Sequence, residues 1–415
     1  MRIRTAGVAA VFTLALVASA AGCGDGKSSS GANSSASPKS AGKLVIWADD
    51  KRTAALKPFA EKFGKDNGLT VEVQAISKDL QTNFVSAHQS DKAPDVVVGA
   101  HDWIGNLVQN GAIEPVQLSA AQKAAFADVA IKGVTYNGQV YGVPYAVENL
   151  ALIRNTELAP NAPSTIEELV QAGTKLKTDG KVSEILSLQV GQSGDAYHIY
   201  PLYSSAGGYL FGTKSNGDYD PTDLGVGKPE SVAAFAKIAT LGEKGSGALK
   251  RSIQADNAIA TFTGKKAAFL VSGPWALTDI KKAGLKYEIT SVPGFAGGKP
   301  AQPFVGVQAF YVASKGKNKT VAQEFVANYL TKTDLAKALY DAEPRPPALT
   351  AALEAVKASD PDAQKFLDAG KNGAILPAIP EMAAIWDPFG KAESAIIGGA
   401  DVPSTVDALA KAVKP

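Results

Sequence analysis

Cysteine is almost absent from this chain, which contains a single one, Cys23, among 415 residues. Without a second cysteine the chain can form no internal disulfide, and a metal site built from several thiolates is excluded. The fold must therefore depend on a hydrophobic core. With 45% hydrophobic residues, the chain is long enough to form two globular domains.

Histidine is scarce and neither sign of charge dominates. The three histidines, His88, His101 and His198, lie far apart, and no carboxylate cluster has metal-ligand spacing, so we expect no metal and no cofactor. We expect His101 to be a structural, hydrogen-bonding residue. Forty-two basic and 40 acidic residues argue against nucleic acid as a partner. No G-x-x-x-x-G-K-[ST] loop occurs, which excludes ATP binding of the P-loop type.

The one long apolar run lies at the start of the chain, where residues 1–22 have the features of an export signal. Arg2 and Arg4 precede an apolar stretch that is shorter than the roughly 20 residues of a membrane span and ends in small residues. "AAGC" resembles a bacterial lipobox, although Ala20 replaces the usual Leu or Val, and predicts a thioether-linked lipid on Cys23. The alternative is an ordinary signal peptide cut near "ASA".

Residues 23–42 are rich in glycine and serine and cannot bury a core, which predicts a flexible tether. A lipid on Cys23 places the protein on the extracytoplasmic face of the cell membrane.

The hydrophobic pattern after residue 42 predicts alternating strands and helices. "KLVIW" at 43–47 and "PDVVVG" at 94–99 are strand-like, and Val71 and Val73 alternate with polar residues. Apolar residues at positions 56, 59, 60 and 63 lie on one face of a helix. This β-α-β-α-β order predicts a parallel sheet of the α/β class.

Two further segments depart from this alternation. Asn137-Gly138 is a strong hairpin signal because both central residues of the tight turn need positive φ. "EPRPPAL" at 343–349 carries three prolines, which neither a helix nor a central strand tolerates, and so predicts a connection between domains.

Polar and aromatic residues follow several of the predicted strands. In open α/β sheets, ligands bind beyond the carboxyl ends of the strands, so these residues are expected to share one cleft. They are Asp49–Arg52, His101–Trp103, Glu148 with Asn149, and Pro274 with Trp275. Carboxylates and amines suit sugar hydroxyls, and flat aromatic rings suit the apolar faces of sugars. The sequence therefore favours a sugar ligand.

Several segments resemble the maltose/maltodextrin-binding proteins, which are solute receptors of ABC importers. They run in the same order over nearly the whole chain after residue 42: "KLVIW", "AHDWIGNLVQNG", "YNGQVYGVPYAVENLALIRN", "VSGPWALTDI", "PFVGV" and "ILPAIPEMAAIWDPF". The resemblance implies a receptor, not an enzyme, that binds maltose or maltodextrin and delivers it to a membrane permease. It implies a monomer without a cofactor.

The resemblance also implies the ligand-binding residues. Acidic and basic contacts to sugar hydroxyls correspond to Asp50, Lys51, Arg52, Asp102, Glu148 and Asp195, with Lys51 and Arg52 interchangeable. Aromatic contacts correspond to Tyr197, Trp275 and Trp386. The chain departs from the family at Gly99, where a tryptophan can stack, at Trp103, where an arginine can bond, and at Asp387, where a tyrosine can stack. Trp103 remains a candidate ligand residue.

The implied fold has two lobes, each a mainly parallel sheet flanked by helices, hinged by crossing segments near 146–150, 302–307 and 343–349. The first lobe is predicted to comprise 43–146 and 305–344, and the second 147–304 and 345–415. Another oligosaccharide, such as trehalose or a β-linked sugar, remains an alternative ligand, and a peptide is a weaker one. A glycoside hydrolase is disfavoured because no pair of carboxylates is set apart for catalysis.

Overall fold

The computed structural model describes residues 41–413 of the chain. The predicted signal peptide, Cys23 and the tether up to residue 40 lie outside the described residues. Within the described part, no helix is both long enough and apolar enough to span a membrane.

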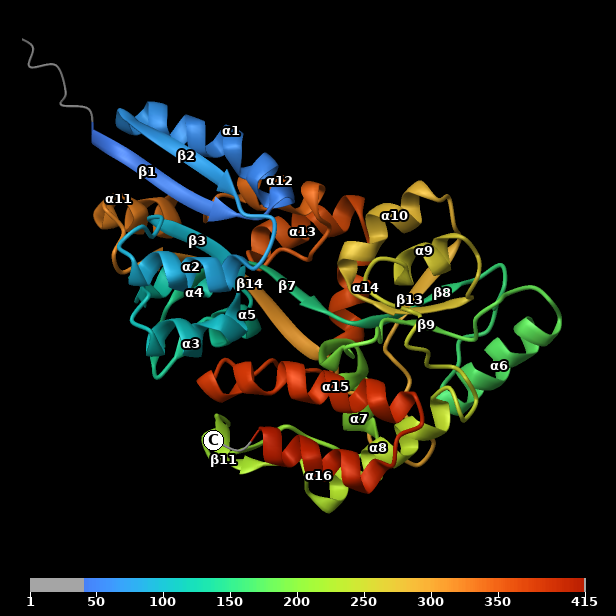
Figure 1. The fold of residues 1–415 in the computed structure, drawn as a ribbon. Coiled ribbons are helices and arrows are strands. Elements are labelled where there is room, and N and C mark those ends of the chain that lie inside the picture. The colour runs from blue at the N-terminus through green and yellow to red at the C-terminus, as the bar shows by residue number, and fades with distance from the viewer. Residues whose placement is uncertain (1–40, 414–415) are drawn as a thin grey trace, which may run out of the picture. The chain divides into compact units, whose positions relative to one another are not determined.

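The first five elements follow the predicted alternation (Figure 1). They are β1 (Ala41–Ala48), α1 (Asp50–Asn67), β2 (Leu69–Ala75), α2 (Leu80–Gln89) and β3 (Val96–Ala100). Strand β1 pairs in parallel with both β2 and β3, as the sequence predicts. Helix α1 buries Leu56, Ala60 and Phe63, because the i, i+4, i+7 spacing places them on one face.

A run of short elements leads from β3 to the predicted hairpin. They are a 3-10 turn at His101–Trp103, α3 (Ile104–Gln109), β4 (Ile113–Glu114), α4 (Ala120–Ala124) and α5 (Asp128–Gly133). The hairpin itself consists of β5 (Thr135–Tyr136) and β6 (Gln139–Val140). Asn137 and Gly138 adopt φ values of 49° and 77°, which confirms the tight turn.

Two long antiparallel strands, β7 (Gly142–Asn149) and β14 (Phe304–Ala313), run side by side through the centre of the described chain. Every residue of both is buried. Strand β14 also pairs with β3, β4 and β15 (Ala374–Ile375), so the first sheet has the order β15-β14-β3-β1-β2. After Leu150 the chain continues from β7 into β8 (Ala151–Asn155), which belongs to the other sheet. The β7 segment thus connects the two sheets.

The second sheet has the order β13-β8-β12-β9, where β9 is Ser187–Leu188, β12 is Phe269–Ser272 and β13 is Tyr287–Thr290. Strand directions correct the prediction of a mainly parallel sheet in each lobe. In the first sheet, β14 runs antiparallel to β3, β4 and β7. The second sheet departs further from the prediction. Strand β8 runs antiparallel to β12 and to β13, and only β12 and β9 are parallel. The difference arises because β8 enters this sheet as the continuation of β7, whereas its neighbours are reached through helices within the lobe.

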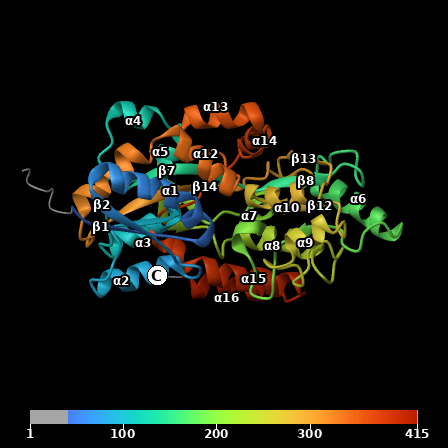
Figure 2. The same cartoon turned by 90° about the horizontal axis from the view of Figure 1, so that it is seen from above.

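Most of the remaining elements are helices, and they lie in both lobes (Figure 2). Those before β14 are α6 (Ile166–Thr178), α7 (Ala196–Ser205), α8 (Pro229–Leu241), α9 (Ala258–Thr263) and α10 (Leu277–Lys282), with a hairpin of β10 (Phe211–Thr213) and β11 (Tyr219–Leu224). Those after it are α11 (Lys319–Glu324), a π-helical turn (Phe325–Tyr329), α12 (Thr333–Ala342), α13 (Thr350–Ser359), α14 (Asp362–Ala369), α15 (Trp386–Ile397) and α16 (Val402–Ala412).

The proline-rich segment 343–349 connects α12 to α13 and forms neither helix nor strand, as its prolines predict. That it connects the two domains stays a prediction. It lies along β7, where Val147 donates its backbone N–H to Pro346 O at 2.8 Å and Ala348 donates to Tyr145 O at 2.9 Å. These bonds hold the segment beside the strand that connects the two sheets.

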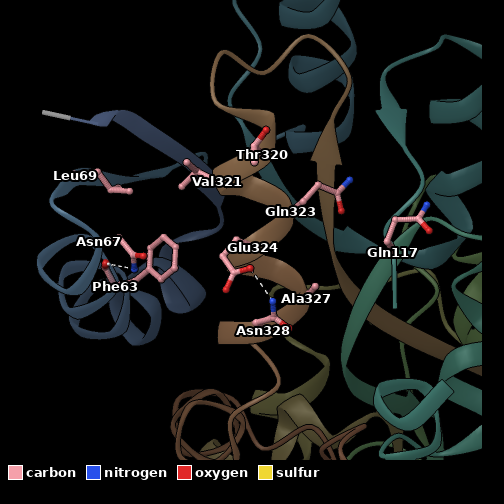
Figure 3. A pocket seen from close by; sticks show the side chains of 10 residues that line it. All are labelled: Phe63, Asn67, Leu69, Gln117, Thr320, Val321, Gln323, Glu324, Ala327 and Asn328. Atoms are coloured by element: carbon pink, nitrogen blue, oxygen red, sulfur yellow. Dashed lines mark hydrogen bonds between the residues drawn. The ribbon is translucent and has the colours of Figure 1, made fainter. Parts of the chain in front are cut away.

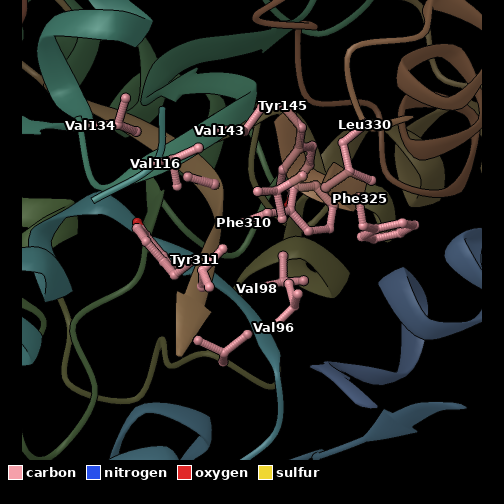
Figure 4. Packing of buried hydrophobic residues seen from close by; sticks show 14 of the residues in the cluster. Val96, Val98, Val116, Val134, Val143, Tyr145, Phe310, Tyr311, Phe325 and Leu330 are labelled. Carbon is pink, nitrogen blue, oxygen red and sulfur yellow. The ribbon is translucent and has the colours of Figure 1, made fainter. Parts of the chain in front are cut away.

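Two large hydrophobic cores give the described chain its two lobes. The first packs around β1, β3, β7 and β14 and includes Phe310, Tyr311 and Phe325 (Figure 4). The second packs around β8, β12 and α7, α8 and α15. The α/β class and the two-lobe arrangement are therefore confirmed. The lobe boundaries stay a prediction, although Ala348, Leu349 and Ala352, which the predicted boundary places in the second lobe, pack in the first core.

Candidate functional site

A cavity of about 610 Å³ lies between residues of the two lobes. Seven of the ten ligand residues predicted from the sequence line it: Lys51, Asp102, Trp103, Glu148, Tyr197, Trp275 and Trp386. Asp50, Arg52 and Asp195 do not. The structure thus brings together side chains that are up to 335 positions apart in the sequence, from Lys51 to Trp386.

The loop after β1 separates two residues that the sequence left interchangeable. Asp49 caps α1 by accepting the backbone N–H of Arg52 at 2.8 Å. Lys51 lines the cavity, with its ammonium 3.6 Å from Glu343 Oε1. Arg52 turns inward and pairs with Asp49 Oδ2 at 2.7 Å, whereas Asp50 is exposed in the first turn. Of these residues, only Lys51 lines the cavity.

The turn after β3 presents Asp102 and Trp103 to the cavity and anchors them through His101. His101 is fully buried and accepts the backbone N–H of Val307 at Nδ1, 3.0 Å away. Its Nε2 lies 2.9 Å from Leu376 O and donates to it. Burial lowers the pKa of His101 to about 4, so the ring is neutral. This confirms the structural role predicted for His101.

Asp102 has an unusual electrostatic position. Burial raises the pKa of its carboxyl to about 7, against the usual value near 3.8. Across the cavity, burial and the charge of Asp102 both raise the pKa of Tyr197. A carboxyl with this pKa changes charge in the neutral pH range.

Gly99 and Trp103, two of the positions where the chain departs from the maltodextrin-binding pattern, are in contact. A Cβ built on Gly99 would collide with the six-membered ring of Trp103. The indole ring therefore covers the place that a side chain at position 99 would occupy. The two departures are coupled: an aromatic ring is present at this wall of the cavity, supplied by a residue four positions later.

Glu148 lies on β7 at the floor of the cavity, with 8% of its surface exposed. Its Oε1 accepts from Gln308 Nε2 at 2.9 Å, and its Oε2 pairs with the guanidinium of Arg345. The Arg345 Nε donates to Glu343 Oε2 at 2.8 Å. Arg52 Nη2 contacts both ends of this set: it lies 4.0 Å from Glu343 Oε2 and donates to Gln308 Oε1 at 3.2 Å. We name these five residues the charged ring.

The charged ring joins β7, β14 and the proline-rich segment. Glu148 comes from β7, Gln308 from β14, and Glu343 and Arg345 from the proline-rich segment, while Arg52 adds the first turn of α1. Because its members are largely buried, each charge depends on its neighbours for solvation.

The second lobe contributes three aromatic side chains to the cavity. Tyr197 lies on α7, Trp275 on a 3-10 turn directly after β12, and Trp386 at the start of α15. The ring of Tyr197 lies 6.3 Å from that of Trp275 and 6.1 Å from that of Phe304, and Trp386 packs edge-on against Phe304 at 6.2 Å. The Tyr197 hydroxyl is buried and has no hydrogen-bond partner among residues 41–413.

Asp195 lies beside the cavity wall and not in it. It caps α7 by accepting the backbone N–H of His198 at 2.9 Å, and it also binds Gln189 and the His198 ring. Its own N–H donates to the buried Glu393 at 3.0 Å. Because its carboxylate is already occupied in this way, Asp195 positions the helix that carries Tyr197.

Six lining residues were not predicted from the sequence: Ala100, Ile259, Asp279, Glu343, Arg345 and Leu376. For the segment that holds Glu343 and Arg345, the sequence predicts only a connection, because its prolines dominate the local pattern. In all, four carboxyl side chains and two basic side chains line the cavity. Within the described chain, no group of three His, Cys, Asp or Glu side chains is arranged to hold a metal ion.

A second cavity of about 490 Å³ lies in the first lobe, between α1 and the α11 region (Figure 3). Its amides bond within their own helices: Asn67 donates to Phe63 O at 2.9 Å and Asn328 donates to Glu324 at 2.7 Å. It contains none of the predicted ligand residues. The cavity between the lobes is therefore the candidate binding site.

Comparisons with known proteins agree with this geometry. The profile of the family described as bacterial extracellular solute-binding protein matches residues 59–365. A galactooligosaccharide-binding protein of Bacillus subtilis (strain 168) is 28% identical, over 97% of this chain and 96% of the relative. A maltooligosaccharide ABC transporter solute-binding lipoprotein of Streptococcus pneumoniae (strain ATCC BAA-255 / R6) is 29% identical, over 83% and 82%. A maltodextrin-binding protein of Bacillus subtilis (strain 168) is 29% identical, over 85% of each chain.

Proposed function

The chain belongs to the family of bacterial extracellular solute-binding proteins, and from this premise we propose that it is the sugar receptor of an ABC importer. The receptor binds maltose or maltodextrin in the cavity between the lobes and delivers it, as a monomer, to a membrane permease. We propose that it is a binding protein and not an enzyme, because its relatives are named as solute-binding and maltodextrin-binding proteins.

One observation carries this proposal: aromatic rings and charged oxygens of both lobes line the same cavity. Trp103, Tyr197 and Trp386 offer flat apolar surfaces to the C–H faces of sugars. Asp102, Glu148 and Lys51 offer acceptors and a donor to the hydroxyls. Hydrogen bonds to charged groups contribute about 1.5–3 kcal/mol each. A few such bonds, less the cost of association, account for micromolar affinity, about −8 kcal/mol.

Calorimetric titration of the soluble domain tests the function and the choice of sugar together. The titrants are maltose, maltotriose, trehalose, cellobiose and a β-linked galactobiose. Micromolar binding of the α-linked glucans alone supports the maltodextrin receptor. Binding of galactobiose alone indicates instead a ligand of the class named for the galactooligosaccharide-binding relative. Absence of binding to all five sugars contradicts the proposed function.

A glycoside hydrolase remains the alternative from a different class. Retaining and inverting enzymes need two carboxyls flanking one bond, about 5–5.5 Å or 6.5–9.5 Å apart. In the cavity, Glu148 and Glu343 are both engaged by Arg345, which leaves neither free to act as nucleophile. Prolonged incubation with maltotetraose and analysis of the products decides; release of glucose contradicts the receptor.

The affinity is expected to rise with pH through neutrality because of Asp102. Below about pH 6 its carboxyl is protonated, and above about pH 8 it is charged and accepts stronger hydrogen bonds from sugar hydroxyls. We expect an increase of about fivefold across this range, and a flat profile for Asp102→Asn. Titrations of both proteins at the two pH values check this. An unchanged wild-type affinity contradicts it.

The same carboxyl affects stability with the opposite sign. Because its pKa is raised in the folded state, the folded protein holds the proton between the unfolded value and about 7, so stability falls as pH rises through this window. Thermal midpoints of wild type and Asp102→Asn, measured across this pH window, separate the contribution of Asp102 from that of other groups. We expect the midpoint of wild type to fall with rising pH more than that of Asp102→Asn.

We propose that Cys23, which lies outside the described residues, carries a lipid that anchors the receptor to the outer face of the membrane. The relatives from Streptococcus pneumoniae are named as lipoproteins, which supports this proposal. We expect Cys23→Ala to release the protein into the medium, measured by immunoblotting of the membrane and medium fractions. Ser30→Ala in the tether is the control and should stay with the membrane. Full membrane retention of Cys23→Ala contradicts the anchor.

A further inference from the structure

Arg345 occupies a central place in the cavity that the sequence did not indicate. It lies on the proline-rich segment beside β7, and its side chain is 12% exposed. Its guanidinium is fixed on two sides, by Glu148 at Nη1 and by Glu343 at Nε. A planar guanidinium held by two carboxylates has little freedom to rotate, so its position is set by the protein.

The same guanidinium lies against an aromatic ring of the second lobe. Its central carbon is 5.0 Å from the centre of the Trp275 ring, a cation–π distance. The Trp275 ring is enclosed elsewhere as well. Tyr197 and His198 lie 6.3 Å and 6.2 Å away, and the six-membered ring packs against Gly273. The face toward the charged ring is therefore taken by a side chain of the protein itself.

The other aromatic residues of the cavity differ in this respect. Trp386 lines the cavity, and no basic group covers Trp386, Trp103 or Tyr197 among the described residues. A guanidinium on an aromatic face is stabilised by the electrostatic attraction of the ring. A sugar ring that stacks on Trp275 must first displace it.

We propose that Arg345 is a specificity-determining residue that occupies the stacking position on Trp275 and so prevents longer oligosaccharides from binding more tightly than short ones. The inference rests on the proposed function. Because Arg345 covers Trp275, the cavity offers one stacking position fewer to a sugar. A longer oligosaccharide therefore gains no aromatic contact there. Removing the guanidinium opens the Trp275 face to one more sugar unit.

The test measures dissociation constants of maltose and maltotetraose for wild type, Arg345→Ala, Trp275→Ala and the double variant. We expect wild type to bind the two sugars within about threefold of each other. Arg345→Ala is expected to prefer maltotetraose by about tenfold. The loss caused by Trp275→Ala should be at least about fivefold greater in the Arg345→Ala background, because the two side chains are in contact.

Arg345→Lys separates charge from shape. Lysine keeps the positive charge for Glu148 but lacks the planar group that covers the indole. We expect it to shift preference toward maltotetraose in the same direction as Arg345→Ala. It also provides the measurement if Arg345→Ala folds poorly, which the thermal midpoint reports.

Two results overturn the inference and remain distinct from failure of the function. The first is a wild type that already prefers maltotetraose by tenfold or more, with no change in Arg345→Ala. The second is an equal effect of Trp275→Ala with and without Arg345. In both cases the sugars still bind, and that binding supports the proposed receptor function. If no sugar of the panel binds wild type or either Arg345 variant, the proposed function fails and this inference fails with it.

Discussion

Replacing Glu148 by alanine is expected to lower the free energy of unfolding by about 3 kcal/mol, because it leaves Arg345 buried beside an empty carboxylate position. Burial already lowers the pKa of Arg345 to about 10, which shows how far its charge is removed from water. Gln308 also loses the acceptor for its Nε2. Reversible urea denaturation measures the change, and sugar affinity should fall with it because Glu148 lines the cavity.

Two controls make this result specific to the charged ring. Asp66→Ala breaks an ion pair with Lys62 at 2.8 Å on the exposed face of α1 and should leave stability nearly unchanged. Glu148→Gln keeps an acceptor for Gln308 and should lose less than Glu148→Ala. If Glu148→Ala lowers the free energy of unfolding no more than Asp66→Ala does, the charged ring does not stabilise the junction of the lobes.

Replacing Trp386 by alanine is expected to weaken sugar binding by about 30-fold, or about 2 kcal/mol, the loss typical of an aromatic residue at the centre of a binding surface. Trp386 begins α15, and its ring is supported edge-on by Phe304 on β14, so the indole is held in place before the ligand arrives. Trp386→Phe retains a flat ring and should recover part of the affinity. Calorimetric titration with the preferred sugar gives both values.

Trp47 offers the matched control for this substitution. It lies on β1, outside the cavity, and its Nε1 donates to Gln74 Oε1 at 2.6 Å. Trp47→Ala should lower the thermal midpoint while the dissociation constant stays near that of wild type. An affinity loss for Trp386→Ala no larger than that for Trp47→Ala contradicts a direct role of Trp386 in binding.

Side chains near a strand end were predictable as a group but not one by one. The order of strands and polar residues predicted that Lys51, Asp102 and Trp275 would share a cleft, and the cavity contains all three. That order could not separate Lys51 from Arg52. Adjacent residues in the first turn of a helix point in directions about 100° apart, and the sequence does not show which direction faces the cleft. Arg52 turns inward because Asp49, Gln308 and Glu343 all accept from it or pair with it there.

Asp195 shows a different limit of sequence reasoning. An acidic residue two positions before a cleft-lining tyrosine is compatible with ligand binding and with helix capping alike. The structure places it as the cap of α7, bonded to His198, Gln189 and Glu393. The backbone N–H of Asp195 donates to Glu393, which lies 198 positions further along the chain, and no local pattern could show this contact.

By itself the sequence determined what depends on neighbouring residues. The strand at β1, the apolar face of α1 and the tight turn at Asn137-Gly138 follow from side-chain periodicity and backbone sterics, which act over a few residues. The α/β class follows from their order along the chain.

Only the tertiary structure decided the antiparallel direction of β8, the ring of Trp103 over Gly99, and the charged ring that fixes Arg345. Gln308 of this ring binds Glu148 and Arg52, residues 160 and 256 positions away. Contacts of this kind carry no periodic signal, because their partners meet only after the lobes have formed and buried them together. The cavity's polar floor is therefore a property of the folded chain.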